Sequence, residues 1–263
     1  MRGREKGGTG RGAGGVSVGR NRTAHEETPM ETTTVLVLVI AALVVVGVVG
    51  AAVAGSASER RRSRGLTLWA SREGWRYDRE RPELVDRFEG VPFLERRSNA
   101  RARHVLCAEL RGRRVLAYEY GYTAPHPQQR HRTVAHVYTV VAVALPVGVP
   151  LLQVEEAGTG AGAPQPRTGG ARAWSTGEAA FDERFAVVAA DGAFAATVLG
   201  EPVREWLLSR EGVCPFRFGG RYLVAWERGA LETGRVRERA DAAISLLERV
   251  PAGVWESAQD TLG

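Results

Sequence analysis

The strongest hydrophobic pattern in the chain is an uninterrupted apolar run over residues 35–53. Its 19 residues comprise nine Val, three Leu and one Ile, separated only by Ala and Gly. At about 1.5 Å of rise per helical residue, this run approaches the roughly 30 Å of a bilayer's hydrocarbon core. Strands rarely exceed about 10 residues, so the length favours a helix over a buried strand. The pattern predicts one transmembrane helix over residues 32–55.

A cleaved signal peptide is the alternative interpretation of this run, since small residues around Ala54 suit a signal peptidase. A signal peptide carries its positive charge before the apolar core. Here acidic residues, from Glu26 to Glu31, precede the core and arginines follow it. This reversed polarity favours the membrane helix.

The arginines that follow the run predict its orientation. Arg60, Arg61, Arg62 and Arg64 lie in a juxtamembrane linker over residues 56–65. Positive residues close to a span stay on the cytoplasmic side of the cell membrane. We therefore expect a single-pass protein with its N-terminus outside and residues 59–263 in the cytoplasm. An extracytoplasmic domain is the alternative that a topology measurement distinguishes.

Residues 1–31 are rich in Gly and Arg without apolar periodicity, which predicts a disordered tail. Met30 directly precedes the apolar run, so a start at Met30 would leave residues 1–29 untranslated. Within the run, Gly47 lies four residues before Ala51, and Gly50 four before Ala54. Small residues at this spacing let helices approach closely, which predicts a homodimer through the membrane helix.

After the linker, alternating apolar positions predict strands. Leu116, Tyr118, Tyr120 and Tyr122 share one face at period two, following a strand over 104–110 and a tight turn at 111–113. Residues 134–145 are apolar on both faces, which predicts a central strand ended by Pro146. The Gly- and Pro-rich stretch 155–171 predicts a loop or linker between two lobes, residues 66–154 and 172–263.

The second lobe combines helices with a hairpin. A strand over 185–190 precedes Asp191, which stands at the N-cap of a helix, and Pro202 begins a second helix. Gly219-Gly220 predicts a two-residue hairpin turn, and apolar spacings of three and four predict a final helix from about Leu231. We expect an α+β fold: one N-terminal transmembrane helix, then antiparallel hairpins with helices packed on one face, arranged as two lobes.

The segment FDERFAVVAADGAFAATVLGEPVREWLL (181–208) contains a pattern of Phe-Asp-x-x-Phe-x-Val, then Asp, Ala, Leu and Pro. It resembles an uncharacterised family of bacterial membrane-anchored proteins, and GRYLVAW (220–226) is similar to that family's following hairpin. The order of one span, an arginine block and GWRY (74–77) is similar to actinobacterial single-pass membrane proteins. The resemblance implies a membrane-tethered α+β domain and no reaction.

The net charge of +6 is concentrated near the predicted membrane helix. From Leu66 onward the chain holds 26 Arg and 25 acidic residues, so it is nearly neutral and does not favour nucleic-acid binding. Arg111, Arg113 and Arg114 belong to a local basic cluster that also contains Arg96, Arg97, Arg101 and Arg103. The cluster predicts contact with the bilayer and its anionic lipid headgroups, and a solvated hairpin tip is the alternative.

Catalytic and cofactor motifs are missing from the sequence. The chain's single lysine, Lys6, lies in the tail, which excludes a phosphate-loop site and a Schiff-base enzyme in the folded part. His126, His131 and His136 suggest a metal site, with solvated loop histidines as the favoured alternative. We therefore predict no cofactor, no metal and no catalysis, but an interaction domain for an unknown protein partner. The alternative is a membrane-tethered enzyme whose site assembles from Asp182, Asp191, His136 and arginines.

Overall fold

The computed structural model describes residues 30–93, 97–126, 128, 132–158 and 170–255, with side chains described throughout except at 30–35 and 47–55. The chain divides into two compact units, Met1–Ser56 and Ala57–Gly263. Residues 1–29 of the predicted tail and most of the predicted 155–171 linker lie outside the described residues.

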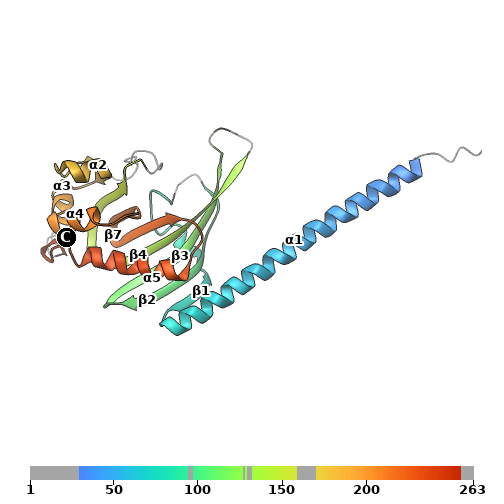
Figure 1. Ribbon diagram of the computed structural model, residues 1–263, viewed down its shortest axis with the longest axis horizontal. Coiled ribbons are helices and arrows are strands. Elements are labelled where there is room, and N and C mark those ends of the chain that lie inside the picture. Colours follow the sequence, from blue (N-terminus) through green and yellow to red (C-terminus); the bar gives the residue numbers. More distant parts are fainter. Residues whose placement is uncertain (1–29, 94–96, 127, 129–131, 159–169, 256–263) are drawn as a thin grey trace, which may run out of the picture. The chain divides into compact units, whose positions relative to one another are not determined.

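The first unit contributes the beginning of α1, a helix that runs from Met30 to Glu73 and so continues into the second unit (Figure 1). Its described apolar side chains, from Leu36 to Val46, are exposed. Among the described residues, no helix is long and apolar enough to cross a membrane. The prediction of a transmembrane helix over residues 32–55 is therefore wrong for this structure.

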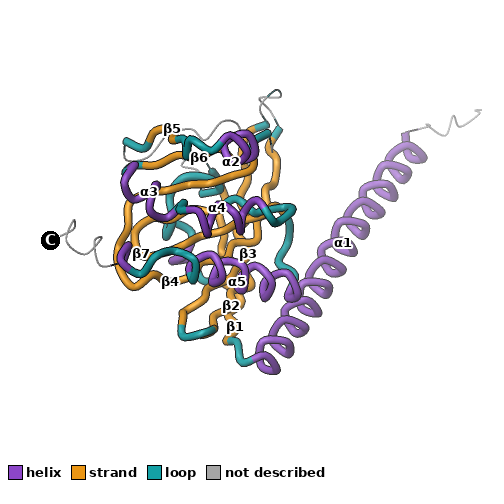
Figure 2. Tube along the Cα trace, turned by 60° about the vertical axis from the view of Figure 1, so that its left-hand side comes forward, coloured by secondary structure: helices purple, strands orange, loops and turns teal. Residues whose placement is uncertain are grey.

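The second unit is built on one antiparallel sheet of seven strands. The order is β1–β2–β3–β4–β6–β5, and β7 also pairs with β4. Both figures of the whole chain show the helices α3, α4 and α5 on one side of these strands (Figures 1 and 2). The strands are β1 (Arg76–Glu80), β2 (Ser98–Leu110), β3 (Arg113–Pro125), β4 (Thr133–Glu156), β5 (Arg172–Trp174), β6 (Phe185–Ala189) and β7 (Phe216–Arg228). The helices are η1 (Pro82–Leu84), α2 (Ala179–Arg184), α3 (Gly192–Val198), α4 (Glu201–Leu208) and α5 (Thr233–Leu247), besides α1.

Strand β4 joins what the sequence predicts to be two lobes. It does not end at Pro146 but continues to Glu156, with register shifts between Ala144 and Leu152 against β7. It pairs with β3 on one side, and with β6 and β7 from the predicted second lobe. The prediction of separate hairpin lobes is therefore wrong, and residues 57–255 form one α+β domain. The Gly-rich linker suggested a boundary because composition marks a loop without showing which strands pair across it.

Strand β7 doubles back at Gly219-Gly220. The amide of Trp226 donates to the carbonyl of Pro215 at 3.1 Å, although 11 residues of extended chain would span about 35 Å. Gly220 has a φ of +53°, a conformation that glycine adopts without steric cost. The two arms of β7 pair with β4 rather than with each other. The chain thus bends at the glycines, as the sequence predicts. The prediction of a two-residue hairpin is wrong, because β4 and not the other arm is the pairing partner.

The sheet carries a core layer on each face. The larger layer holds the buried side of the helices, including Leu66 and Ala70 of α1 and Leu247 of α5. The smaller layer is rich in tyrosine and is covered by the segment 81–93, which contains η1, together with Arg97. The central residues of this smaller layer are Leu84, Phe93, Ala102, Val105, Tyr118, Tyr120, Tyr122, Tyr138, Val140, Ala142, Val224 and Trp226.

Candidate functional site

A cleft opens between α4, the loop 210–216, β7 and α5. Its cavity volume is about 70 Å³, and about 560 Å³ when the space open to solvent is included. Apolar side chains form much of its lining: Leu207, Phe216, Leu223, Ala225, Ala242, Ala243 and Leu246. Charged residues also line it, namely Arg210, Glu211, Glu238 and Arg239. The cleft therefore combines apolar surface with charged groups.

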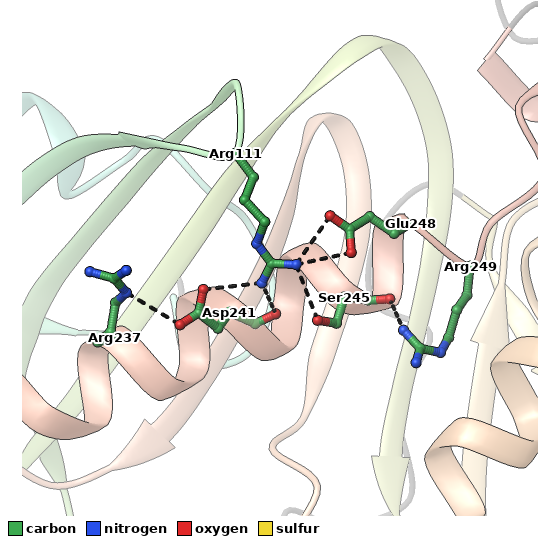
Figure 3. Close-up of polar contacts among 6 residues, drawn as sticks. All are labelled: Arg111, Arg237, Asp241, Ser245, Glu248 and Arg249. Carbon is green, nitrogen blue, oxygen red and sulfur yellow. Dashed lines mark hydrogen bonds and ion pairs between the residues drawn. The ribbon is translucent and has the colours of Figure 1, made fainter.

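Trp206 holds two cations beside this cleft. The guanidinium carbons of Arg210 and Arg249 lie 4.8 Å and 5.1 Å from the centroid of its ring. Arg249 is anchored by a hydrogen bond from Nη1 to the Ser245 carbonyl at 2.6 Å (Figure 3). A cation over an indole face contributes roughly 0.5–1 kcal/mol at an exposed site. Positive charge is thereby held beside the cleft.

The polar part of the cleft lining holds Cys214 close to a charged pair. Arg239 Nη2 donates to Glu227 Oε2 at 3.0 Å, and the Cys214 thiol lies 3.9 Å from the same oxygen. Burial raises the pKa of Cys214 to about 11, so the thiol is protonated at neutral pH. A protonated thiol is a poor nucleophile, and this geometry does not activate it.

The predicted membrane-contacting arginines fall into two groups. Arg62 and Arg111 are engaged within the domain: Arg62 Nη2 lies 2.6 Å from Glu119 Oε2, and Arg111 binds α5 (Figure 3). The remaining five have no ion pair with any residue that the structure describes, and all but the half-buried Arg113 are exposed: Arg60, Arg61, Arg64, Arg113 and Arg114.

The residues predicted to assemble an enzyme site have structural roles. The Asp182 carboxylate accepts four hydrogen bonds from Ser175, Thr176 and Gly177. Asp191 caps α3 by accepting from the amides of Ala193 and Phe194, as predicted. His136 stacks on Tyr122 with ring centroids 4.9 Å apart.

Histidine does not build a metal site in the part of the chain that the structure describes, where no three His, Cys, Asp or Glu side chains are grouped for an ion. His131 lies outside that part. His104 is buried, and its Nδ1 is 3.0 Å from the Tyr77 hydroxyl while its Nε2 is 3.3 Å from Glu59 Oε1. Burial lowers the pKa of His104, so the imidazole is neutral at neutral pH.

No family model and no curated protein matches the chain. A search of solved structures finds a similar fold in the crystal structure of the mycobacterial trehalose monomycolate transport factor A, TtfA. The TM-score is 0.52 at 16% sequence identity, covering 72% of this chain and 96% of that one. At this identity the similarity establishes a shared fold alone. The resemblance to membrane-anchored families stays a prediction.

The cleft itself is the feature that sequence reasoning missed. Its lining comes from α4, β7 and α5, which are separated by up to 40 positions between Trp206 and Leu246. The periodic spacing of apolar residues predicts that such residues lie in the core. The one available sequence signal was the density of arginines around Trp206, at positions 204 and 210.

Proposed function

We propose that residues 57–255 form a non-catalytic accessory factor for lipid transport, and that the cleft between α4 and α5 receives an acyl chain. The observation that carries this proposal is the apolar surface formed by Leu207, Leu223 and Leu246 beside the cations Arg210 and Arg249. Apolar lining with a few positioned polar groups is typical of small-ligand sites.

The fold comparison supports the same direction. The protein with the similar fold is named as a transport factor for trehalose monomycolate, an acylated sugar. Its fold is covered almost completely, at 96% of that chain. We extend lipid handling to the present chain because the cleft offers apolar surface of the kind an acyl chain buries, at about 25 cal/mol per Å².

The five arginines without an ion pair to a described residue supply the second element of the proposal. Arg60, Arg61 and Arg64 follow one another closely on α1, and Arg113 and Arg114 follow the β2–β3 turn. Each arginine near an anionic surface contributes about 1 kcal/mol. We propose that they hold the domain against anionic lipid headgroups.

The acyl-chain site is tested by fluorophore-labelled palmitate titrated into the full chain, with trehalose monopalmitate and trehalose as competitors. We expect saturable binding that trehalose monopalmitate displaces and trehalose does not. Ala242→Phe places a ring in the cleft and should weaken binding about tenfold or more, whereas Ala196→Phe on exposed α3 should not. Equal affinities of the two variants would contradict the assignment of the cleft. Release of palmitate from trehalose monopalmitate by the chain would favour the alternative, an enzyme.

The headgroup contact needs its own test. Vesicles with and without phosphatidylglycerol are mixed with the full chain and sedimented. We expect Arg113→Gln combined with Arg114→Gln to reduce binding to the anionic vesicles only. As a matched control, Arg235→Gln with Arg237→Gln removes the same charge from α5. An equal loss in both double variants would indicate bulk charge rather than this surface.

A further inference from the structure

Arg217 is a buried cation without an acidic partner among the residues that the structure describes. It lies on β7, on the face that the segment 81–93 covers, and is 6% exposed. Its Nη1 donates one long hydrogen bond, 3.5 Å, to the Val91 carbonyl. Its guanidinium carbon lies 5.6 Å from the ring centroid of Trp226. It forms no ion pair with any described residue, and the exposed Glu89 acts on its charge only from beyond ion-pair distance.

Two further polar groups in the same layer lack partners. The hydroxyls of Tyr118 and Tyr120 are buried without a hydrogen bond. Tyr118 pairs with Val140 across β3 and β4, and Val140 pairs with Trp226 across β4 and β7. Tyr118 therefore lies in the same cross-strand row as the indole that Arg217 covers. The two side chains are close enough for the Arg217 charge to act on the Tyr118 hydroxyl.

This arrangement is unfavourable unless something completes it. Burial lowers the pKa of Arg217 to about 10, so the side chain still carries its charge at neutral pH. An uncompensated buried charge and an unsatisfied buried hydroxyl both destabilise the folded state. The guanidinium can only donate, and a tyrosine hydroxyl can donate as well as accept, so a negatively charged acceptor would satisfy all of these groups.

We propose that Arg217 and the Tyr118 hydroxyl form a binding site for an oxyanion, a carboxylate or phosphate group, borne by an amphiphile. Two guanidinium donors fit the paired oxygens of such a group. The indole of Trp226 provides an apolar face beside the guanidinium, and Phe88 and Phe93 belong to the same layer. The exposed 6% of Arg217 leaves the guanidinium within reach of an anion from the surface.

This site is separate from the cleft. Phe216 and Phe218, the neighbours of Arg217 along β7, belong to the core layer on the helix-covered face of the sheet. Because strand side chains alternate, Arg217 faces the other layer. The oxyanion site therefore stands or fails independently of the acyl-chain cleft.

Calorimetric titration of the full chain tests the site with three probes: inorganic phosphate, decanoate and decanol. We expect decanoate to bind most tightly, phosphate to bind more weakly, and decanol not to bind. Arg217→Met should weaken decanoate binding about tenfold or more. Tyr118→Phe should weaken it less. Arg228→Met removes an exposed charge from the same strand and should bind like the unaltered chain.

The stability of the variants separates a binding role from a structural one. Without ligand, Arg217→Met should melt at the same temperature as the unaltered chain or higher, since an apolar side chain replaces an uncompensated charge. Decanoate should raise the melting temperature of the unaltered chain but not of Arg217→Met. Failure of both anions to bind, or undiminished decanoate binding by Arg217→Met and Tyr118→Phe, would overturn the site. Equal binding of phosphate and decanoate would overturn the apolar part of the ligand.

Discussion

Arg111 and Glu248, which are 137 positions apart, are joined through a single guanidinium. Nη1 of Arg111 donates to both carboxylate oxygens of Glu248, at 3.1 Å and 2.9 Å. Nη2 donates to Oδ1 and to the carbonyl of Asp241, at 3.0 Å and 3.1 Å (Figure 3). The β2–β3 turn is thereby fastened to two successive turns of α5.

Replacing Arg111 with Gln should loosen this fastening. The three side chains are 42–46% exposed, so we expect a loss of only about 0.5–1 kcal/mol in the free energy of unfolding. Denaturant unfolding measures it, and high salt should shrink the difference. Arg113→Gln, on the same turn without an ion pair to a described residue, is the control. A larger effect of Arg113→Gln would contradict the role of Arg111.

Glu119 should couple α1 to the loop before α5. Its Oε2 accepts from Arg62 Nη2 at 2.6 Å and from the amide of Leu231 at 3.1 Å. Glu119 is 13% and Arg62 33% exposed, so water screens the pair only in part. A double-mutant cycle with Glu119→Gln and Arg62→Gln should give a coupling energy of about 1 kcal/mol or more. Additive losses would show that the two side chains act independently.

Asp182 should make stability depend on pH in the acid range. Burial raises the pKa of its carboxyl, but hydrogen bonds from Ser175, Thr176 and Gly177 outweigh this and lower it below the ordinary value. Its stabilisation is thus complete above the unfolded pKa of about 3.9 and is lost as pH falls through the lower folded value. Asp182→Asn should flatten the fall in unfolding free energy below about pH 4.5. Glu183→Gln removes the same charge from an exposed neighbour and is the matched control.

Cys214 should resist alkylation while the domain is folded. Burial raises the pKa of this thiol to about 11, leaving little thiolate at pH 8. In a Cys107→Ser chain, iodoacetamide should modify Cys214 slowly under native conditions and completely after unfolding in guanidinium. Mass spectrometry reads the modified fraction. Labelling as fast as a free thiol would show that this part of the cleft is open to solvent.

Local patterns predicted several elements of this domain correctly. The period-two run at 116–122 lies in β3, Asp191 caps α3, Pro202 lies in the first turn of α4, and α5 buries the apolar residues spaced by three and four. Each of these elements depends on neighbours within one turn or one strand. Such information is contained in short stretches of sequence.

Those local patterns could not predict which strands, distant in the sequence, pair in the sheet. Pro146 suggested a strand end, yet β4 continues past it, because a register shift against β7 accommodates the interruption. The oxyanion site was equally invisible, since Arg217 was one more arginine in a chain with 36 basic residues. Its burial and lack of an acidic partner emerge only when β7 doubles back and the segment 81–93 covers it.

Because β4 pairs with strands from both halves of the chain, the domain cannot be divided into two independently folding parts. A fragment ending near residue 158 would keep β1 to β4 but leave β4 with the backbone donors and acceptors that β6 and β7 normally take. Bare strand edges of this kind recruit other chains. Either half produced alone should aggregate. The two halves produced together should associate and form one folded complex.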